Sequence, residues 1–254
     1  MILLRAIILA AGKGSRLGEL TKNISKGMLK LFGKTLIERQ IEIYQKCGID
    51  DITIVTGYKS EMINFSGINY VKNQDYDTTN MNESLFCASE KLSDSVIISY
   101  TDIVFEQKMI EQMLQFSGDI GVAVSLNWKK NYDGRTLHPL SEAENVLIEN
   151  DKIIQIKKNI SEASSDQKIG EFLGVMKLSN EGGKILLQKY LELKENHTET
   201  FHMAKSFKDA YITDMLQEII DSGCDVSPVI VDGNWYEIDT PQDLEEVERS
   251  SMFN

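Results

Sequence analysis

A short apolar run that ends in two closely spaced glycines is the feature that most constrains this chain. Residues 6–11 read Ala-Ile-Ile-Leu-Ala-Ala, which has the length and composition of a buried strand. Gly12-Lys13-Gly14-Ser15-Arg16 follows directly, and its glycines let the backbone turn tightly and bring N–H groups close to an anion. Arg16 and the later Lys26 add the positive charge that a polyphosphate needs. We therefore expect this loop to hold a nucleoside triphosphate.

Two better-known phosphate-binding motifs do not fit the same stretch. A dinucleotide-binding fingerprint needs glycine at the sixth position counted from Gly12, and Leu17 stands there. A Walker loop needs Gly-Lys-Ser/Thr in this region, whereas Gly18 is followed by Glu19 and Leu20. The spacing therefore excludes both motifs.

Length and composition indicate an ordinary globular protein. The 254 residues are 42% hydrophobic and 26% charged, enough for a large core in one α/β domain. The formal net charge of −12 argues against nonspecific binding to nucleic acid or a membrane surface. No apolar run approaches the length of a membrane-spanning helix, and the N-terminus lacks a signal-peptide pattern. The scattered Cys47, Cys87 and Cys224 predict three buried thiols in a reducing cytoplasm.

The apolar patterns alternate between strand and helix along the first half of the chain. Strands are predicted over 5–11, 51–57, 67–73 and 95–100, and helices over 35–47 and 81–92. This alternation predicts an α/β fold with a doubly wound, mostly parallel, Rossmann-like sheet. In the second half, strands are predicted over 120–126 and 171–178 and helices over 181–194 and 209–222, with polar loops at 128–145 and 157–170. We expect a single domain, 1–254, with a nucleotide-binding half (1–117) and a half (118–254) that binds the second substrate, the acceptor.

The opening motif resembles the signature of the nucleotidyltransferase (pyrophosphorylase-like) superfamily. That signature is a strand, then Leu-Ala-Ala-Gly-x-Gly-Ser/Thr-Arg, then Pro-Lys about ten residues later; here Ser25 replaces the proline, which predicts a less rigid approach to Lys26. The resemblance implies catalytic roles for Arg16 and Lys26. It also implies nucleotide contacts from the loop residues Leu9, Ala10, Ala11, Gly12, Gly14 and Ser15.

Three carboxylates are candidates for a magnesium site. Asp102 follows the apolar run 95–100, where a carboxylate can bind a hard cation; the alternative is an N-cap for a helix near Gln107. The segment Asn234-Trp-Tyr-Glu-Ile-Asp-Thr-Pro resembles the closing motif of the superfamily, in which an acidic residue completes the metal site. Glu237 and Asp239 lie two residues apart, on one face of an extended strand, and the sequence does not choose between them. Pro241 is expected in the first turn of a helix.

The segment from Tyr76 to Ala88 narrows the resemblance to small cytidylyltransferases. In these enzymes Asn and Ser open a helix beside the base, so Asn80, Asn82 and Ser84 could bind a pyrimidine edge. The alternative for each of them is helix capping.

A second cluster resembles a segment of cytidylyltransferases that act on phosphocholine, phosphonates or phosphoglutamine. It comprises Trp128, Tyr132, Arg135, His138 and residues 139–144. Arg135 is expected to grip the acceptor's phosphate or phosphonate, and Trp128 and Tyr132 to flank its ammonium group by cation–π contact. The alternative is a loop with packed aromatic side chains.

Two further positions complete the candidates in the second half. The superfamily resemblance assigns Lys158 to the acceptor and the α-phosphate, with Glu171 as an additional acceptor contact. His138, His197 and His202 are expected to be structural or exposed and to form no metal set.

Together these features predict a Mg²⁺-dependent cytidylyltransferase. It would transfer CMP from CTP to a small phosphorylated or phosphonylated acceptor and release pyrophosphate, with no nucleic-acid or membrane partner and with possible self-association. One alternative is a sugar-1-phosphate nucleotidyltransferase that uses UTP or dTTP. Another is a noncatalytic nucleotide-binding regulatory module.

Overall fold

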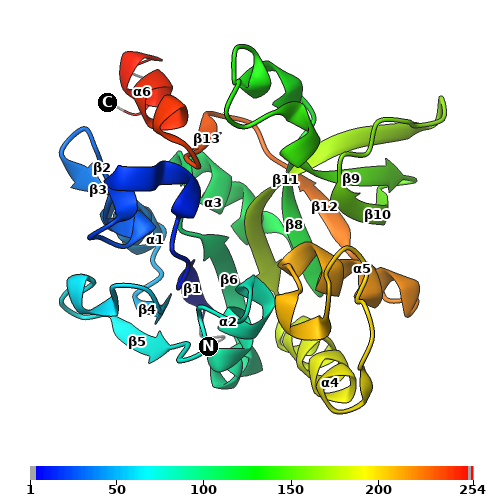
Figure 1. Ribbon diagram of the computed structural model, residues 1–254. Coiled ribbons are helices and arrows are strands. Elements are labelled where there is room, and N and C mark those ends of the chain that lie inside the picture. The colour runs from blue at the N-terminus through cyan, green and yellow to red at the C-terminus, as the bar shows by residue number, and fades with distance from the viewer. Residues whose placement is uncertain (1–3, 251–252, 254) are drawn as a thin grey trace.

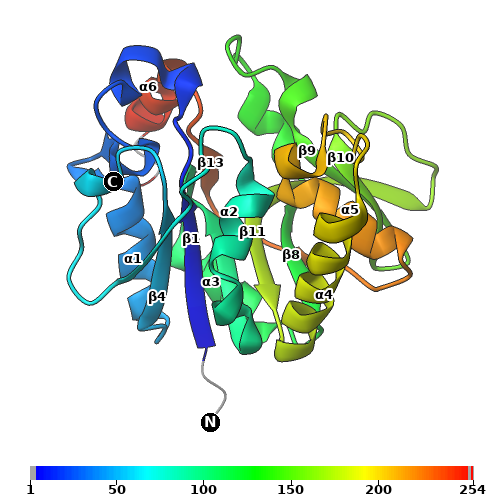
Figure 2. The same cartoon turned by 60° about the horizontal axis from the view of Figure 1, so that its bottom comes forward.

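The centre of the fold is a mixed sheet of nine strands in a computed structural model that describes residues 4–250 and residue 253 (Figures 1 and 2). Its first part is parallel, in the order β5-β4-β1-β6, formed by β1 (Leu4–Ala10), β4 (Asp51–Thr56), β5 (Asn69–Lys72) and β6 (Ser95–Tyr100). Residues 6–10 of β1 are all buried, as expected for a parallel strand covered on both faces. The predicted strands of the first half are therefore confirmed, and so is the α/β fold class.

The second half extends this sheet largely with antiparallel strands. β11 pairs antiparallel with β6, β8 and β9, whereas β12 runs parallel to β8. These strands are β8 (Ile120–Ser125), β9 (Glu144–Glu149), β10 (Lys152–Lys158), β11 (Gln167–Leu178) and β12 (Ser227–Ile230). Sequence reasoning missed β9 and β12 and placed the start of β11 four residues late. The long strand β11 acquires its pairing from segments far away in the sequence, which local pattern does not reveal.

Helices cover both faces of the sheet (Figure 1). α1 and α3 pack together on one face, and α2, α4 and α5 lie on the other. Their bounds are α1 (Leu36–Lys46), α2 (Met81–Cys87), α3 (Gln107–Gln115), α4 (Asn180–Asn196), α5 (Ile212–Asp221) and α6 (Pro241–Ser250). The predicted helix over 81–92 is split, since α2 ends at Cys87 and a 3₁₀ turn follows over Ser89–Ser93.

The bounds of α1 follow from its sequence. Thr35 Oγ1 accepts from Glu38 N at 3.1 Å, and Glu38 Oε2 accepts from Thr35 N at 2.6 Å, so a capping box begins the helix. Gly48 follows the last turn with φ +78°, a left-handed conformation that glycine adopts without strain. The two ends position the apolar face of α1 against the sheet.

A small two-stranded sheet joins the end of the chain to its beginning. β7 (Ile103–Phe105), which follows β6, pairs antiparallel with β13 (Trp235–Glu237), and Glu237 lies opposite Ile103. α6 then packs against the 3₁₀ turn η1 (Ser15–Thr21), which follows the glycine loop. The closing motif is thus brought to the carboxyl ends of β1 and β6, and Pro241 stands in the first turn of α6 as predicted.

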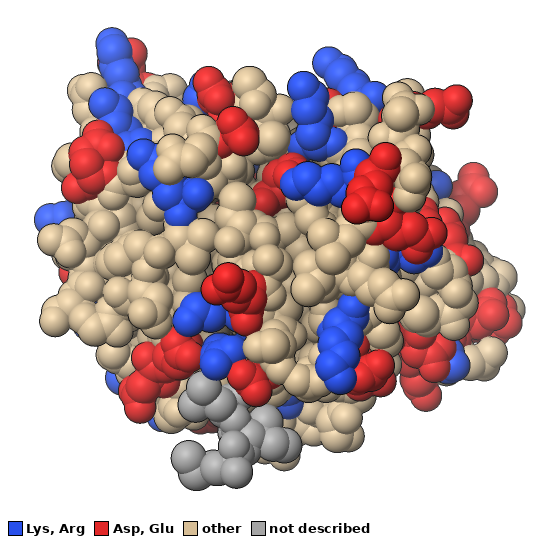
Figure 3. Space-filling model, turned by 90° about the horizontal axis from the view of Figure 1, so that it is seen from below, with Lys and Arg blue, Asp and Glu red and all other residues tan. Residues whose placement is uncertain are grey.

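The surface carries charges of both signs. On the face that Figure 3 shows, basic side chains are separated by acidic or uncharged ones. Within residues 4–250 and 253, no helix combines the length and hydropathy needed to cross a membrane. The cysteines are free thiols as expected, but they are not buried: Cys87 is exposed, and Cys47 and Cys224 are half-buried. Cys87 occupies the last turn of the short α2, at the edge of its packing surface.

Candidate active site

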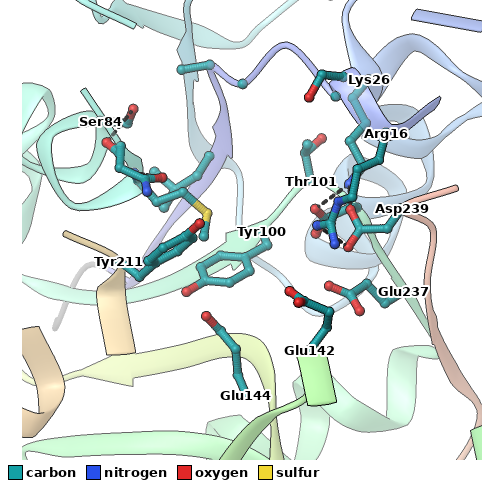
Figure 4. Close-up of a pocket in the computed structure, with 18 of the residues that line it drawn as sticks. Arg16, Lys26, Ser84, Tyr100, Thr101, Glu142, Glu144, Tyr211, Glu237 and Asp239 are labelled. Carbon is teal, nitrogen blue, oxygen red and sulfur yellow. Dashed lines mark hydrogen bonds and ion pairs between the residues drawn. The ribbon is translucent and has the colours of Figure 1, made fainter. Parts of the chain in front are cut away.

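The carboxyl ends of β1 and β6 lie side by side and open into a cavity of about 630 Å³. Ligands bind at this edge in open α/β sheets, because the loops after adjacent strands converge there. The cavity is lined from both halves of the chain: by the glycine loop, by residues after β6, by α2, and by the segments around residues 139, 158, 211 and 238. Figure 4 shows Arg16, Lys26 and Asp239 gathered on one side and Ser84 and Tyr211 on the other, with Tyr100 between them.

The glycine loop forms one wall of this cavity. Leu9, Ala11, Gly12, Gly14 and Ser15 all line it. Ala10 does not, because its side chain lies in the core, 1% exposed.

Gly14 has a steric reason to be glycine. Its φ is +62°, and an added Cβ would lie 3.0 Å from Lys26 Cβ. This contact brings the loop against the stem of Lys26.

Lys26 forms ion pairs with two carboxylates of the cavity, Asp102 and Asp239. Its Nζ lies 2.7 Å from Asp102 Oδ2 and also contacts Asp239 Oδ1, and Arg16 Nη2 lies 2.5 Å from Asp239 Oδ2. Although burial alone would lower it, these two carboxylates raise the pKa of Lys26 above its ordinary value. Burial alone would raise the pKa of Asp239, but the positive charges of Lys26 and Arg16 outweigh it, so the pKa of Asp239 is lowered. Lys26 and Asp239 are therefore both charged near neutral pH.

Asp102 does not cap the following helix. The N-cap of α3 is Glu106, so the capping alternative for Asp102 is wrong. Its Oδ2 accepts from Lys26, while its Oδ1 is buried and has no hydrogen-bond partner among the described residues. A buried unpaired carboxylate oxygen facing a cavity is a suitable ligand for a hard cation.

Glu237 and Asp239 both line the cavity but differ in their partners. Asp239 is neutralised by Lys26 and Arg16, whereas no lysine or arginine of the described part of the chain lies within ion-pair distance of Glu237. Burial and the neighbouring charges of Asp239 and Asp102 raise the pKa of Glu237 well above its usual range. A bound cation would remove this unfavourable clustering of negative charge, so Asp102 and Glu237 are the donors best suited to hold it.

His138 belongs to this cluster, contrary to the sequence-based expectation. Its side chain lies 3.5 Å from Glu237 Oε2 through Nε2 and 3.3 Å from Asp239 Oδ2 through Nδ1. Burial and then the charge of Arg135 lower the pKa of His138 to about 4, so the ring is neutral. Arg135 donates to Nδ1 at 2.9 Å, which leaves the proton on Nε2, directed at Glu237. Only the short spacing from Arg135 in the same loop could have indicated this position.

Arg135 does not line the cavity, so the expectation that it binds the acceptor's phosphate or phosphonate is wrong. Its side chain is 1% exposed; its Nε donates to Asp243 Oδ1 at 2.9 Å and its Nη2 donates to the Glu237 carbonyl at 3.2 Å. Asp243 also accepts from the backbone N–H groups of Asp239 and Thr240, at 3.0 and 2.7 Å. Arg135 therefore ties its loop to the start of α6 through Nε and Nη2, away from the cavity.

Trp128 and Tyr132 are packed rather than presented to the cavity. Both are buried, with ring centroids 5.7 Å apart in an edge-to-face arrangement. The Tyr132 hydroxyl donates to Glu171, so the alternative of packed aromatic side chains describes this cluster. Glu171 instead lines a small neighbouring cavity.

Asn80 and Ser84 line the main cavity from the start of α2, whereas Asn82 faces away and is fully buried. Asn80 is the N-cap of α2: its Oδ1 accepts from Met81 N at 2.8 Å, and its Nδ2 donates to the Asp209 carbonyl. Ser84 Oγ accepts from Asn73 at 3.0 Å. Both residues thus reach the cavity while also stabilising the local structure.

Lys158, at the end of β10, reaches the cavity on the opposite side from the glycine loop. Its Nζ lies 2.8 Å from Glu142 Oε2 and 5.1 Å from the centre of the Tyr211 ring. Tyr100, Glu142, Glu144 and Tyr211 are lining residues that sequence reasoning did not single out. Glu142 and Glu144 lie in the segment 139–144; Glu142 ends a 3₁₀ turn and is partly exposed, whereas Glu144 is half-buried at the start of strand β9, which was not predicted.

The fold and this site define a Rossmann-like nucleotidyltransferase. The model of the family described as "MobA-like NTP transferase domain" matches residues 6–173, and the chain belongs to that family. The CTP:phosphoglutamine cytidylyltransferase of Campylobacter jejuni is 31% identical over 253 residues, spanning 95% of this chain and 98% of the relative. The choline-phosphate cytidylyltransferase of Streptococcus pneumoniae is 37% identical over 107 residues, 41% of this chain and 47% of the relative.

Solved structures support the same family. The CTP:phosphocholine cytidylyltransferase of Streptococcus pneumoniae superimposes with a TM-score of 0.74 at 26% identity, over 98% of this chain and all of the other. The inositol-1-phosphate CTP transferase of T. maritima superimposes with a TM-score of 0.72 at 25% identity, over 98% of this chain and 94% of the other.

Proposed function

We propose that this protein is a Mg²⁺-dependent cytidylyltransferase that transfers CMP from CTP to a small phosphorylated or phosphonylated acceptor. The observation that carries this proposal is the single cavity in which the glycine loop, Arg16 and Lys26 face Asp102, Glu237 and Asp239. The named cytidylyltransferase relatives support the choice of nucleotide and acceptor class.

The reaction is an in-line displacement at the α-phosphorus of CTP. An oxygen of the acceptor's phosphate or phosphonate forms the new P–O bond, and the bond to the β-phosphate oxygen breaks to release pyrophosphate. The attacking oxygen is already anionic at neutral pH, so no strong general base is needed. Catalysis then consists of positioning the two anions and offsetting their charge.

The chain supplies cations on both sides of the reacting phosphorus. The glycine-loop amides and Arg16 bind the β- and γ-phosphates, and Lys26 offsets charge at the α-phosphate. Lys158, on the opposite wall, attracts the acceptor's anionic end. Arg16 and Lys26 are ion-paired to Asp239, and exchanging this carboxylate for phosphate oxygens keeps them charge-compensated throughout.

Asp102 and Glu237 would hold the divalent cation, for which the unpaired Asp102 oxygen and the clustered carboxylates are suited. When bound, such a cation neutralises and orients phosphate oxygens. The Nε2–H of His138 faces the Glu237 carboxylate and helps to fix its orientation. Asp243, which is paired with Arg135, accepts from the backbone N–H of Asp239 and so positions that residue.

The base would lie against α2. Asn80 and Ser84 offer polar groups there to a pyrimidine edge, and the backbone at Leu9 and Ala11 forms the adjoining wall.

A sugar-1-phosphate nucleotidyltransferase is the second candidate. It is favoured by a 29% identical match, over 71% of this chain and 44% of the relative, to the bifunctional protein GlmU of Methanocaldococcus jannaschii. A noncatalytic module is disfavoured by the complete set of cavity cations and carboxylates.

Pyrophosphate release tests these alternatives. The purified protein with Mg²⁺ would be assayed with CTP, UTP and dTTP against phosphocholine, 2-aminoethylphosphonate, phosphoethanolamine and glucose 1-phosphate. We expect turnover with CTP and a small non-sugar acceptor. Preference for UTP or dTTP with the sugar phosphate would support the second candidate, and nucleotide binding without turnover would support the noncatalytic one.

A further inference from the structure

A second, much smaller cavity opens beside the main one. Its volume is about 20 Å³, and it shares Tyr100, Glu142, Glu144 and Glu237 with the main cavity. Beyond these shared residues, its walls are apolar apart from Glu171. A cavity of this size accommodates one water-sized group.

Two polar groups that line this small cavity are buried without partners. Glu171 is 4% exposed; one of its carboxylate oxygens accepts from Tyr132, while Oε2 has no hydrogen-bond partner among the described residues. The hydroxyl of Tyr100, a residue 6% exposed, is unpartnered in the same sense. Buried polar atoms are normally satisfied, so an unpaired carboxylate oxygen and an unpaired hydroxyl, which can also accept, at one small cavity indicate the place of a missing donor.

The charge of the small cavity has the same sign throughout. In the described part of the chain, no lysine or arginine lies within 4 Å of the Glu144 or Glu171 carboxylates; Glu144 accepts only from Thr213, at 3.3 Å. Glu142 differs, because it is paired with Lys158. Burial raises the pKa of Glu144 to about 7 and that of Glu171 to about 8, which shows how poorly these carboxylates are compensated.

We propose that this small cavity binds a primary ammonium group of the acceptor, held by Glu144, Glu171 and the Tyr100 hydroxyl. The inference rests on the proposed cytidylyl transfer and narrows its substrate class to acceptors with an anionic end and a primary ammonium end. Three N–H donors match three acceptor groups, and the positive charge compensates the two carboxylates.

The size of the cavity excludes a quaternary ammonium. A trimethylammonium group has no N–H to donate and is larger by three methyl groups, whereas the space is that of a single water. In Figure 4 the Tyr100 hydroxyl points away from Arg16 and Asp239 and lies near the Glu144 carboxylate. The anionic end can thus face Lys158 and the reacting phosphate while the ammonium enters the small cavity.

A methylation series of one acceptor tests this inference. CMP transfer from CTP would be measured with phosphoethanolamine, its N-methyl and N,N-dimethyl derivatives, phosphocholine, and the uncharged analogue propyl phosphate. We expect kcat/KM to fall along the series and to be about 10- to 100-fold higher for phosphoethanolamine than for phosphocholine or propyl phosphate. Equal or better use of either of the last two would overturn the inference while leaving cytidylyl transfer intact.

Glu171→Gln tests the residues. It should lower kcat/KM for phosphoethanolamine about tenfold or more relative to kcat/KM for propyl phosphate, so that the preference for the acceptor with the ammonium group narrows. Glu162→Gln, at an exposed position outside both cavities, is the matched control and should change neither value. Equal losses on both acceptors would contradict the assignment. If Glu171→Gln fails to fold, Tyr100→Phe removes only the unpartnered hydroxyl and should narrow the preference in the same direction.

Ligand-induced thermal stabilisation keeps this test separate from catalysis. Phosphoethanolamine should raise the Tm of the wild type more than propyl phosphate does, and Glu171→Gln should abolish the difference. Absence of CMP transfer to every acceptor would refute the proposed function. In that event the Tm difference alone decides the inference, and equal shifts for both ligands would refute it.

Discussion

Lys26 holds together carboxylates that come from distant parts of the chain. Asp102 is 76 residues away and Asp239 is 213 residues away, and the lysine contacts both while being 7% exposed itself. With Arg16, the two cations balance Asp102 and Asp239, while Glu237 adds a further carboxyl group that neither cation pairs with. Binding of a polyphosphate therefore needs additional positive charge, which agrees with the spare oxygen of Asp102 and the unpaired Glu237.

Asp102→Asn should leave the fold intact and lower kcat by ~10³-fold, because the amide keeps the shape but removes charge from the cation site. Lys26 keeps its second carboxylate partner, Asp239, in this variant. The check is the rate of pyrophosphate release at saturating CTP, together with Tm as a measure of folding. Asp166→Asn, at an exposed position, is the control and should retain full activity. Near-normal turnover in Asp102→Asn would remove Asp102 from the proposed site.

Ser25→Pro should stabilise the protein by about 0.4–1 kcal/mol through the reduced entropy of the unfolded chain. Ser25 has φ −64°, which is the φ of proline, and its buried hydroxyl has no partner among the described residues. The backbone is thus already in the conformation that proline would impose, although sequence reasoning expected a looser approach to Lys26. Urea unfolding measures the effect. A decrease in the unfolding free energy would show that the ring does not fit this buried position.

At the scale of elements, the agreement between sequence and structure divides at the middle of the chain. β1, β4, β6 and α1 match their predicted ranges to within a residue or two, because buried aliphatic runs and a capping box define them locally. β9 was missed because its polar positions follow no clear alternation and its burial comes from pairing with β11 and β10. In this half, long-range pairing decides the structure.

The same division holds for the site. Most residues of the opening motif, and Asp102, Lys158, Glu237 and Asp239, reach the cavity as predicted, since each lies in or directly after an element whose position the topology fixes. Arg135 was misplaced because its partner, Asp243, lies 108 residues away, and no local pattern shows that the pair is buried. Glu144 was not recognised as a lining residue because it is the first residue of β9, and this strand was not predicted.

Arg135→Ala should therefore destabilise the fold rather than selectively weaken acceptor binding. It would leave the fully buried Asp243 unpaired at the start of α6, which costs on the order of 3–5 kcal/mol. Urea unfolding should show the loss, and Lys129→Ala, at an exposed position of the same loop, should show little change. If Arg135→Ala left the unfolding free energy unchanged and raised KM for the acceptor alone, Arg135 would have to be assigned to acceptor binding after all.

At the scale of the whole molecule, the two halves meet at the cavity and depend on one another there. The C-terminal segment returns through β13 to pair with β7, directly after Asp102, and Ile238 N donates to the Asp102 carbonyl at 3.0 Å. The parallel half alone thus supplies the nucleotide loop but neither Glu237 nor Asp239. The far wall, with its buried carboxylates, comes from strands β9, β10 and β11. Ligand binding should consequently stabilise the molecule as a unit.

The pH dependence of stability follows from those buried carboxyl groups. The pKa of Glu144 is raised to about 7 and that of Glu171 to about 8, from an ordinary value of 4.5. Between these limits the folded state holds protons that the unfolded chain has released, so the unfolding free energy falls as pH rises, by up to about 1.4 kcal/mol per pH unit for each proton. His138 acts oppositely, because its pKa is lowered to about 4: the ring is neutral in the folded state throughout, whereas in the unfolded chain it is about half protonated at pH 6.5 and largely neutral above about pH 7.5. In the window from pH 6.5 to 8.5, a comparison of two proteins that share His138 therefore reports on the carboxyl group by which they differ.

In that window we expect the wild type to lose more unfolding free energy than Glu171→Gln, which cannot release a proton at that position. Glu144 interacts electrostatically with Lys158, Asp102, Asp214 and Tyr100 and accepts from the Thr213 hydroxyl, all of which the variant keeps. Besides burial, Glu144 also raises the pKa of Glu171, so the difference between the two proteins reports on Glu171 together with its repulsion toward Glu144. Urea unfolding at pH 6.5, 7.5 and 8.5 measures it. Phosphoethanolamine should reduce the loss in the wild type alone, since an ammonium ion in the small cavity favours the charged carboxylate. Parallel losses in the two proteins, with or without the ligand, would show that Glu171 does not titrate here and that its unpaired oxygen is already compensated.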